Sequence, residues 1–425
     1  RIESFSDRNL ETQNYLIHLS LGSGREYFVN NLKLSKTDYM GNAIAIGEFL
    51  LRRLIYFEDK ATFIAAADLI PTAHDINFKY VIKNSNTSLY DGVAGLSLFF
   101  AYLSQGTGDR RYKRAALSLA RTAFSQVEKL DSVSSYNGIG ANIYLSAHLF
   151  SIFDEKWVLE EGDISVNKLS DIVYKDENYD LLLGSSGAIL SLFSFIKVTS
   201  SESAEYALSK LVRHLVESID SRELHSKLLY QRGYSHGYSG IAYVLAMVFE
   251  YTGDRNFSDL ALDLLKLEDS LLKKGVWTDE HKIDGKYQVS WCHGSAGIAL
   301  ARANVKDILG GNENETETIL KASVENLKNN FWLNSHCLCH GTIGNLEILT
   351  ELYSLDSELI SDIDRKDIEK NVFAKIAEDG WTSITKEQSM NLGLMTGLSG
   401  LGYSYLRHAM DHRVPSILTM QKPIT

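Results

Sequence analysis

The residues best suited to chemistry in this sequence are two cysteines, each followed by a histidine and a glycine. The tripeptide begins at Cys292 and again at Cys339, and the 425-residue chain contains only three cysteines. Thiolate and imidazole groups are the donors that Zn²⁺ prefers, and three protein donors with one open position are typical of catalytic zinc sites. Cys292, Cys339 and His340 are therefore candidate zinc ligands, with His293 as an alternative fourth. The remaining cysteine, Cys337, is interpreted as a small buried hydrophobic residue.

The two tripeptides belong to a longer pattern in which paired small residues, three positions apart, precede an apolar run. The pattern occurs seven times, and its first glycines are 46 to 57 residues apart. The pairs are Gly92/Gly95, Gly138/Ala141, Gly184/Gly187, Gly237/Gly240, Gly294/Gly297, Gly341/Gly344 and Gly397/Gly400. Recurrence at this near-regular spacing indicates a repeat architecture, because one structural unit is used again and again.

Each repeat is predicted to contain two helices of different exposure. The run after the small residues, as in residues 96–103 or 241–249, is apolar on nearly every side, which is typical of a buried helix. The sequence Thr-Gly-Asp-Arg at 107–110 and 252–255 then supplies a glycine to end one helix and an aspartate to cap the next. The segment after the first of these signals is amphipathic, so it predicts a helix with one wet face.

Seven such pairs predict an all-α fold, an α/α toroid of seven inner and seven outer helices. An open solenoid would need polar repeats at its ends, and neither end of the chain shows one. We expect residues 41–425 to form this domain, whereas residues 1–40 lack the motif and are predicted to form a leading helix and a linker. In a ring the starts of the inner helices meet at one end, so the reactive residues of repeats four to six, His236 among them, are predicted to converge there.

Composition excludes several other classes of function. The net charge of -11 argues against a nucleic-acid groove or an anionic membrane surface, since both require a basic face. Three cysteines cannot form a disulfide framework, and no apolar run is long enough to span a membrane. We therefore expect a cytoplasmic protein that acts on a substrate of another kind.

Seven stretches between about residue 85 and the C-terminus match a known pattern. They are LYDGVAGLSLFFAYL, DLLLGSSGAI, YSHGYSGIAYVLA, SWCHGSAGIALAR, LCHGTIGNLEIL, GLMTGLSGLGY and VPSIL. Together they resemble the lanthionine synthetase C-like cyclases, and more narrowly the C-terminal cyclase domain of class II (LanM-type) lanthipeptide synthetases. The resemblance implies an α/α toroid, one zinc ion, and closure of thioether rings by addition of a peptide cysteine thiol to dehydroalanine or dehydrobutyrine.

The same resemblance implies two partners. One is a dehydrated precursor peptide made on the ribosome, which is the substrate. The other is an N-terminal dehydratase domain of the same full-length enzyme, because residues 10–21 look like the junction that follows such a domain. The sequence begins at Arg1 and not at methionine, so we expect it to be part of a longer protein.

Carried over position by position, the resemblance makes Cys292, Cys339 and His340 the zinc ligands. His236 matches the motif histidine that serves as acid and base, and Asp180, in the DLLLG stretch, matches the motif aspartate near it. An aspartate just before a helix is often only an N-cap, which is the competing interpretation of Asp180.

Two positions depart from the pattern of some class I relatives. Those relatives carry an arginine four residues before the first zinc cysteine, where this chain has Gln288, and often a tyrosine directly after it, where this chain has His293. The group that stabilises the enolate is therefore unassigned. Arg232, which lies four residues before His236, is a candidate substitute for that group, and a surface salt bridge is the alternative. His293 and Arg232 are also candidates for a supporting position behind the zinc ligands.

The implied chemistry fits these residue types. A free thiol, with a pKa of about 8.5, is only slightly ionised at pH 7, and zinc with an open position can bind it and remove its proton. Conjugate addition then places negative charge on the substrate carbonyl and requires a proton at the α-carbon. An imidazole with a pKa of about 6.5 suits that task, and a neighbouring carboxylate such as Asp180 can orient His236 or raise its pKa.

Three other functions compete with this interpretation. A zinc-dependent protein prenyltransferase also combines an α/α barrel with a thiol substrate, but it needs a cluster of basic residues for a diphosphate. A toroidal glycosidase needs two converging carboxylates, for which Asp91 and Asp180 are placed, yet it gives the cysteines no purpose. A zinc-stabilised or glutathione-binding scaffold without ring-forming activity differs in one testable respect, namely whether the fourth metal position exchanges.

Overall fold

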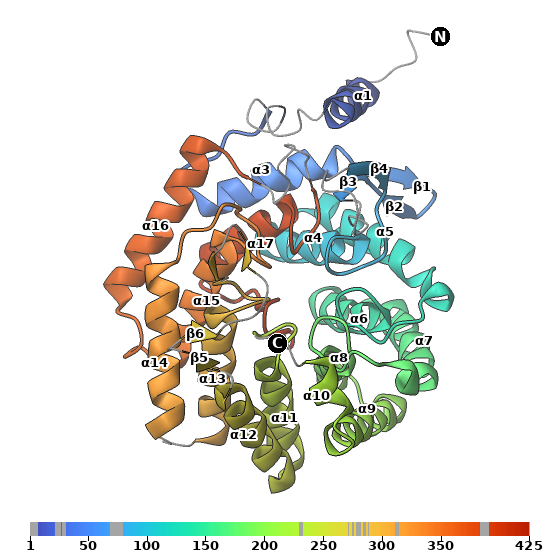
Figure 1. Ribbon diagram of the computed structural model, residues 1–425. Coiled ribbons are helices and arrows are strands. Elements are labelled where there is room, and N and C mark those ends of the chain that lie inside the picture. Colours follow the sequence, from blue (N-terminus) through green and yellow to red (C-terminus); the bar gives the residue numbers. More distant parts are fainter. Residues whose placement is uncertain are drawn as a thin grey trace.

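The chain winds into a closed ring of paired helices, seen in a computed structural model that describes residues 7–21, 27, 31–68, 80–228, 233–270, 272–273, 276–277, 282–283, 286–287, 289–310, 314–382 and 391–424 (Figure 1). Seven inner helices surround the centre: α4 (Val93–Thr107), α6 (Ile139–Phe153), α8 (Ser185–Val198), α11 (Tyr238–Thr252), α13 (Ser295–Leu309), α15 (Thr342–Leu355) and α17 (Leu398–Ala409). Seven outer helices cover them: α3 (Tyr39–Leu51), α5 (Arg110–Phe124), α7 (Lys156–Ile172), α9 (Glu202–Asp220), α12 (Arg255–Ser270), α14 (Asn314–Asn329) and α16 (Asp362–Asp379). The predicted α/α toroid is confirmed.

Burial separates the two kinds of helix as their sequences predict. The first twelve residues of α4 are all buried, whereas α5 buries one face and exposes arginines on the other. Between them, Gly108 ends α4 in the left-handed conformation at a φ of 72°, and the Asp109 carboxylate accepts a hydrogen bond from the Arg111 backbone N–H. The helix-stop and helix-start signals in the first Thr-Gly-Asp-Arg sequence are thus confirmed.

The second glycine of the repeated pair permits a close backbone contact. A β-carbon on Gly240 would lie 1.9 Å from the carbonyl oxygen of Tyr234, and one on Gly344 would lie 2.0 Å from that of Leu338. In both repeats the contacting carbonyl belongs to the residue six positions earlier. The loop therefore folds tightly over the start of its own inner helix, which only a residue without a side chain allows.

The ring closes through a helix that carries no copy of the glycine motif. Six inner helices pack against the outer helix that follows them in sequence, but α17 has no following helix and packs against α3. The inner helix α17 also contacts α4, the first of the inner ring. Residues from near the start and the end of the chain thus lie side by side (Figure 1).

A cycle of hydrogen bonds joins the seven loops at the end of the ring where the inner helices start. Its members are the residues two positions before each first glycine: Tyr90, Tyr136, Leu182, Ser235, Cys292, Cys339 and Met395. Six bonds join members directly: Tyr90 N to Tyr136 O, Leu182 N to Ser235 O, Ser235 Oγ to Cys292 O, Cys292 N to Cys339 O, Cys339 N to Met395 O and Met395 N to Tyr90 O. The remaining link, between the second and third loops, is made by Ser134 Oγ, which donates to Leu182 O. Both cysteines of the repeated tripeptide are members of this cycle.

The C-terminal segment after α17 fills the centre of the ring. Side chains from five inner positions donate to its backbone carbonyls: Tyr403 to Pro415, Tyr136 to Ile417, Trp291 to Leu418, Tyr144 to Gln421 and Lys197 to Pro423, at 2.7 to 3.0 Å. Figure 1 places the C-terminus at the middle of the toroid. The interior is therefore packed with protein and is not an open channel.

The other elements in the part of the chain that the structure describes are short or lie outside the ring. They are α1 (Asp7–Ser20), α10 (Glu223–Lys227), the 3₁₀ turns Val127–Lys129 and Val173–Lys175, and four two-stranded antiparallel sheets. The strands are β1 (Ile55–Phe57) with β2 (Lys60–Thr62), β3 (Ile64–Asp68) with β4 (Tyr80–Asn84), β5 (Leu272–Lys273) with β6 (Val276–Trp277), and β7 (Lys282–Ile283) with β8 (Lys286–Tyr287). Among the described helices, none combines the length and the apolar character needed to cross a membrane.

A buried ion-pair network stabilises the junction between the last repeats and the C-terminal segment. Arg407 on α17 donates through Nε to Glu347 at 2.7 Å, bonds Glu351, and donates to the Val414 carbonyl at 2.6 Å. Arg407 and Glu347 are 3% and 1% exposed. If one of them were removed, water could not solvate the charge of the other.

We expect Arg407→Met to destabilise the fold by about 3–5 kcal/mol, because two buried carboxylates lose their cation. Urea unfolding followed by circular dichroism measures this as a lower midpoint. The control is Arg111→Met, which removes an ion pair with Glu48 on the solvent-facing surface and should shift the midpoint far less. Equal midpoints for Arg407→Met and the unmodified chain would contradict a stabilising role for the network.

Candidate metal centre

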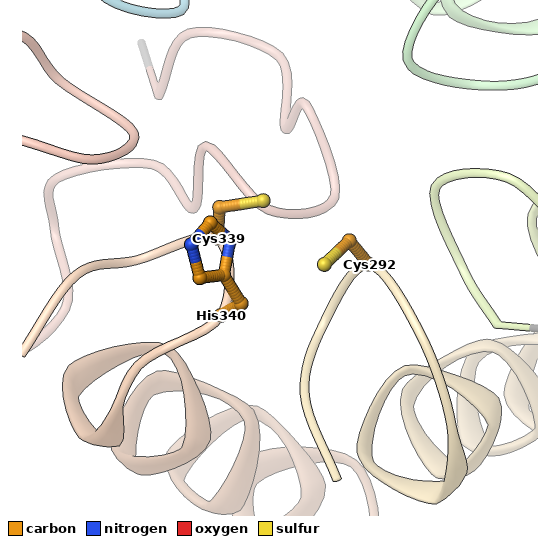
Figure 2. A group of neighbouring side chains, drawn as sticks. All are labelled: Cys292, Cys339 and His340. Carbon is orange, nitrogen blue, oxygen red and sulfur yellow. The ribbon is translucent and has the colours of Figure 1, made fainter. Parts of the chain in front are cut away.

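Three donor side chains converge where the loops of the fifth and sixth repeats meet. The sulfurs of Cys292 and Cys339 and a ring nitrogen of His340 all lie within 4.8 Å of one another. Figure 2 shows the three side chains approaching from the loops that precede two inner helices, α13 and α15. The convergence of these residues, expected from their equivalent places in the repeat, is present in the structure.

The loop backbones fix the two cysteines relative to each other. Cys292 N donates to Cys339 O at 3.4 Å, and Cys339 N donates to Met395 O at 3.0 Å, so each cysteine is tied to the next repeat. Gly294, after the first cysteine, has a φ of 89°, which a residue with a side chain rarely adopts. The glycine of the first tripeptide is thus needed to turn the chain back after Cys292.

The three donor groups differ in how strongly each holds its proton. A hydrogen bond with Cys339 lowers the pKa of the Cys292 thiol well below its usual value, against the effect of burial and with help from His340. Burial raises the pKa of Cys339 well above its usual value. For His340, burial lowers the pKa, but the sulfurs of Cys337 and Cys292 raise it well above the usual value. Cys292 is thus the thiolate of the group, whereas Cys339 and His340 hold protons that a metal ion would displace on binding.

A histidine and an aspartate form a second pair beside these donors. Nδ1 of His236, in the loop before α11, lies 2.8 Å from Oδ2 of Asp180, while Oδ1 accepts from the Leu183 backbone N–H at 2.6 Å. Burial lowers the pKa of His236, but the hydrogen bond and negative charge of Asp180 outweigh it and leave that pKa raised. The interpretation of Asp180 as only an N-cap is incomplete, because one carboxylate oxygen holds the imidazole.

His293 connects the pair with the metal-binding loop. Its ring stacks on that of His236, with centroids 5.3 Å apart and planes 25° from parallel, and it directly follows Cys292. A cavity of about 280 Å³ opens against both histidines and Asp180, and its wall includes Glu177 and Lys227. A substrate in this cavity would therefore lie against the His236 imidazole.

Two further residues of the site were not identified from the sequence. The Tyr90 hydroxyl hydrogen-bonds the sulfur of Cys339, and Cys337 contacts His340. Tyr90 occupies, in the first repeat, the loop position that holds the cysteines in the fifth and sixth, so its place in the repeat is a usable signal. Arg232 and Gln288 lie outside the described residues, so the expected supporting position of Arg232 stays a prediction.

The carboxylate that a glycosidase would need beside Asp180 is engaged elsewhere. Asp91 accepts hydrogen bonds from Asn391 Nδ2 at 2.9 Å and from the Thr396 backbone N–H at 3.0 Å. Burial raises its pKa to about 6 despite these bonds. Asp91 thus ties the loop of the first repeat to that of the seventh, a role in ring closure.

Known proteins resemble this chain in sequence and in fold. A family model described as lanthionine synthetase C-like protein matches residues 84–419. The lacticin 481/lactococcin biosynthesis protein LcnDR2 of Lactococcus lactis subsp. lactis is 31% identical over 196 residues, and the match covers 41% of this chain and 20% of that protein. The chain thus spans about a fifth of the length of this relative. The structure of nisin cyclase has a TM-score of 0.64 at 16% identity, over 79% of this chain and 92% of its own, and shares the fold.

Proposed function

The chain belongs to the lanthionine synthetase C-like family, and from this premise we propose that it is a zinc-dependent lanthipeptide cyclase. It would form lanthionine and methyllanthionine rings by adding cysteine thiols to dehydroalanine and dehydrobutyrine in a ribosomally made peptide. The observation that carries the proposal is the meeting of two buried cysteines and a histidine at one end of the toroid. Names of relatives that refer to nisin and lacticin 481 support this choice of substrate class.

Cys292, Cys339 and His340 would hold the zinc ion. When bound, zinc supplies a positive charge that lowers the pKa of a substrate thiol, so that it is nucleophilic near neutral pH. Three protein donors would leave one position for that thiol, as in catalytic zinc sites and not in structural ones. The donor set, two thiols and an imidazole, fits zinc better than magnesium or calcium, which prefer oxygen.

His236 would supply the proton that completes the addition. Sulfur bonds to the β-carbon, the electron pair of the carbon–carbon double bond moves toward the substrate carbonyl, and the α-carbon then takes a proton. The raised pKa of His236 keeps its imidazole protonated at higher pH, and the bond to Asp180 fixes its orientation. His293, stacked on His236, holds the ring from its other side.

Asp180→Asn is expected to shift the pH dependence of ring closure without removing zinc. The loss of the carboxylate lowers the pKa of His236, so the protonated form disappears at lower pH. The alkaline limb of kcat/KM should therefore move toward lower pH, as a pH–rate profile on a dehydrated peptide will show. An alkaline limb that stays in place would exclude His236 as the proton donor.

The rival functions find less support in the described residues. A prenyltransferase needs cations free to bind a diphosphate, but Lys227, at the cavity wall, forms a salt bridge with Glu177 at 3.3 Å. A scaffold that only binds zinc or glutathione gives no role to the His236–Asp180 pair. For the full-length protein we propose a dehydratase domain before residues 1–40, residues 41–425 as the cyclase domain, and a cytoplasmic location.

The direct test is incubation of the chain with a dehydrated, cysteine-containing peptide. A cyclase converts the peptide into a product of unchanged mass that no longer reacts with a thiol-alkylating reagent. The metal-chelated protein and a peptide whose cysteine is replaced by serine are the controls. A peptide that stays fully alkylatable with zinc-loaded protein would favour the scaffold.

A further inference from the structure

We propose that Cys337 is a positioning residue of the metal centre, whose sulfur holds the imidazole of His340 so that the other ring nitrogen faces the metal. This inference rests on the proposed zinc site. It gives a role to the one cysteine that the repeat pattern leaves unexplained. All three cysteines of the chain then serve one centre.

The contacts of Cys337 point to His340. The Cys337 sulfur accepts a hydrogen bond from the His340 backbone N–H at 3.4 Å, and the His340 side chain hydrogen-bonds both Cys337 and Cys292. Ser335 Oγ lies 3.4 Å from the same sulfur. The imidazole thus interacts with two sulfurs, and one of them belongs to the donor group.

Cys337 is placed to orient a ligand and not to be one. The group of atoms within 4.8 Å of one another contains Cys292, Cys339 and His340 but not Cys337. If its sulfur were a fourth ligand, the site would be a closed structural one. A sulfur that contacts His340 without joining the donor group would instead leave the fourth position for a substrate.

The loop holds Cys337 rigidly enough for this task. Its carbonyl accepts a hydrogen bond from Gly344 N at 3.2 Å, and its side chain is 1% exposed. A β-carbon on Gly341 would lie 2.3 Å from Cys337 N, so the chain wraps closely around this residue. Because the start of α15 fixes Cys337, its sulfur can define the rotation of the His340 ring.

Histidine ligands usually donate their second ring N–H to a carboxylate, carbonyl or water, and losing that partner weakens metal binding about 10- to 100-fold. In the proposed arrangement, the Cys337 sulfur takes this place. We therefore expect Cys337→Ala to bind one zinc ion per chain but about 10- to 100-fold more weakly, as measured by competition with a chromophoric chelator.

The conservative variant separates positioning from packing. Cys337→Ser keeps an atom that accepts a hydrogen bond, whereas Cys337→Ala keeps the apolar character, so a merely packed cysteine is better replaced by alanine. Positioning predicts that serine preserves zinc affinity better than alanine, even if thermal unfolding of the metal-free variants ranks them in the opposite order. Zinc affinity that is equal in both variants and in the unmodified chain would overturn the proposal.

Cobalt substitution tests the remaining alternative. The sulfur-to-cobalt charge-transfer band should keep its intensity in both Cys337 variants, because two thiolates remain bound. A loss of about a third would make Cys337 a ligand and overturn the proposal. Ring closure by the unmodified chain is assayed in parallel. A chain that binds zinc without closing rings contradicts the cyclase proposal only. The order of zinc affinities among the unmodified chain and the two Cys337 variants still decides the role of Cys337.

Discussion

Cys339→Ala is expected to abolish zinc binding and ring closure together. Cys339 is 3% exposed and supplies one of two sulfurs in the donor group, so the variant retains only Cys292 and His340. Two protein donors do not hold zinc in the way that three or four do. Zinc content, measured on the purified variant, should fall from one ion per chain to near zero, and the dehydrated peptide should remain fully alkylatable.

The matched control is Met395→Ala. Met395 occupies the same loop position in the seventh repeat and accepts the Cys339 backbone N–H through its carbonyl, which the substitution keeps. This variant should retain one zinc ion per chain. It therefore distinguishes the effect of removing a buried side chain from the effect of removing a metal donor. A Cys339→Ala protein that still holds one zinc ion would contradict the assigned ligand set.

His236→Asn is expected to have the second large effect, in which ring closure is lost but zinc binding is kept. The zinc ion should remain, because His236 is not part of the donor group, while the rate of ring closure should fall about 10²- to 10⁴-fold with loss of the acid–base group. The asparagine side chain can still hydrogen-bond Asp180, so the loop keeps its anchor. Single-turnover assays with a dehydrated peptide measure the loss.

A histidine outside the ring provides the comparison. His18 lies on α1, away from the donor group, and His18→Asn should close rings at the normal rate. Ring closure by His236→Asn at the rate of the unmodified chain would remove His236 from the mechanism. A His236→Asn protein without zinc would instead show that this residue supports the metal centre.

The repeat pattern predicted the fold and the convergence of the metal-binding residues because both depend on local, periodic signals. Seven glycine pairs indicate seven equivalent helix starts, and equivalent starts in a ring must meet. That is why Cys292 and Cys339, 47 residues apart, are neighbours. The caps at Gly108 and Asp109 are likewise set by the few residues around them.

Other features depend on contacts that no local pattern encodes. The helix α3 closes the ring against α17, yet it lies more than 300 residues away and carries no glycine motif. The C-terminal segment is held by side chains from loops and helices around the ring, such as the indole of Trp291 on the Leu418 carbonyl. Such pairings follow only once the ring has formed.

The side chains that support the donors were hidden for a related reason. Cys337 reads as an ordinary buried cysteine, since nothing in its neighbours shows that its sulfur faces His340. The contact between Tyr90 and Cys339 joins the first and sixth repeats. Equivalence of position places a residue in the loop cycle but does not say which way its side chain points.

The central claim, one zinc ion in a site that closes thioether rings, is tested most directly by native mass spectrometry of the purified chain. The spectrum is recorded before and after addition of a dehydrated, cysteine-containing peptide, and the peptide is then treated with a thiol-alkylating reagent. We predict one zinc ion per chain and a peptide that no longer accepts the reagent. A folded, freshly prepared chain that carries no zinc would contradict the account at its centre.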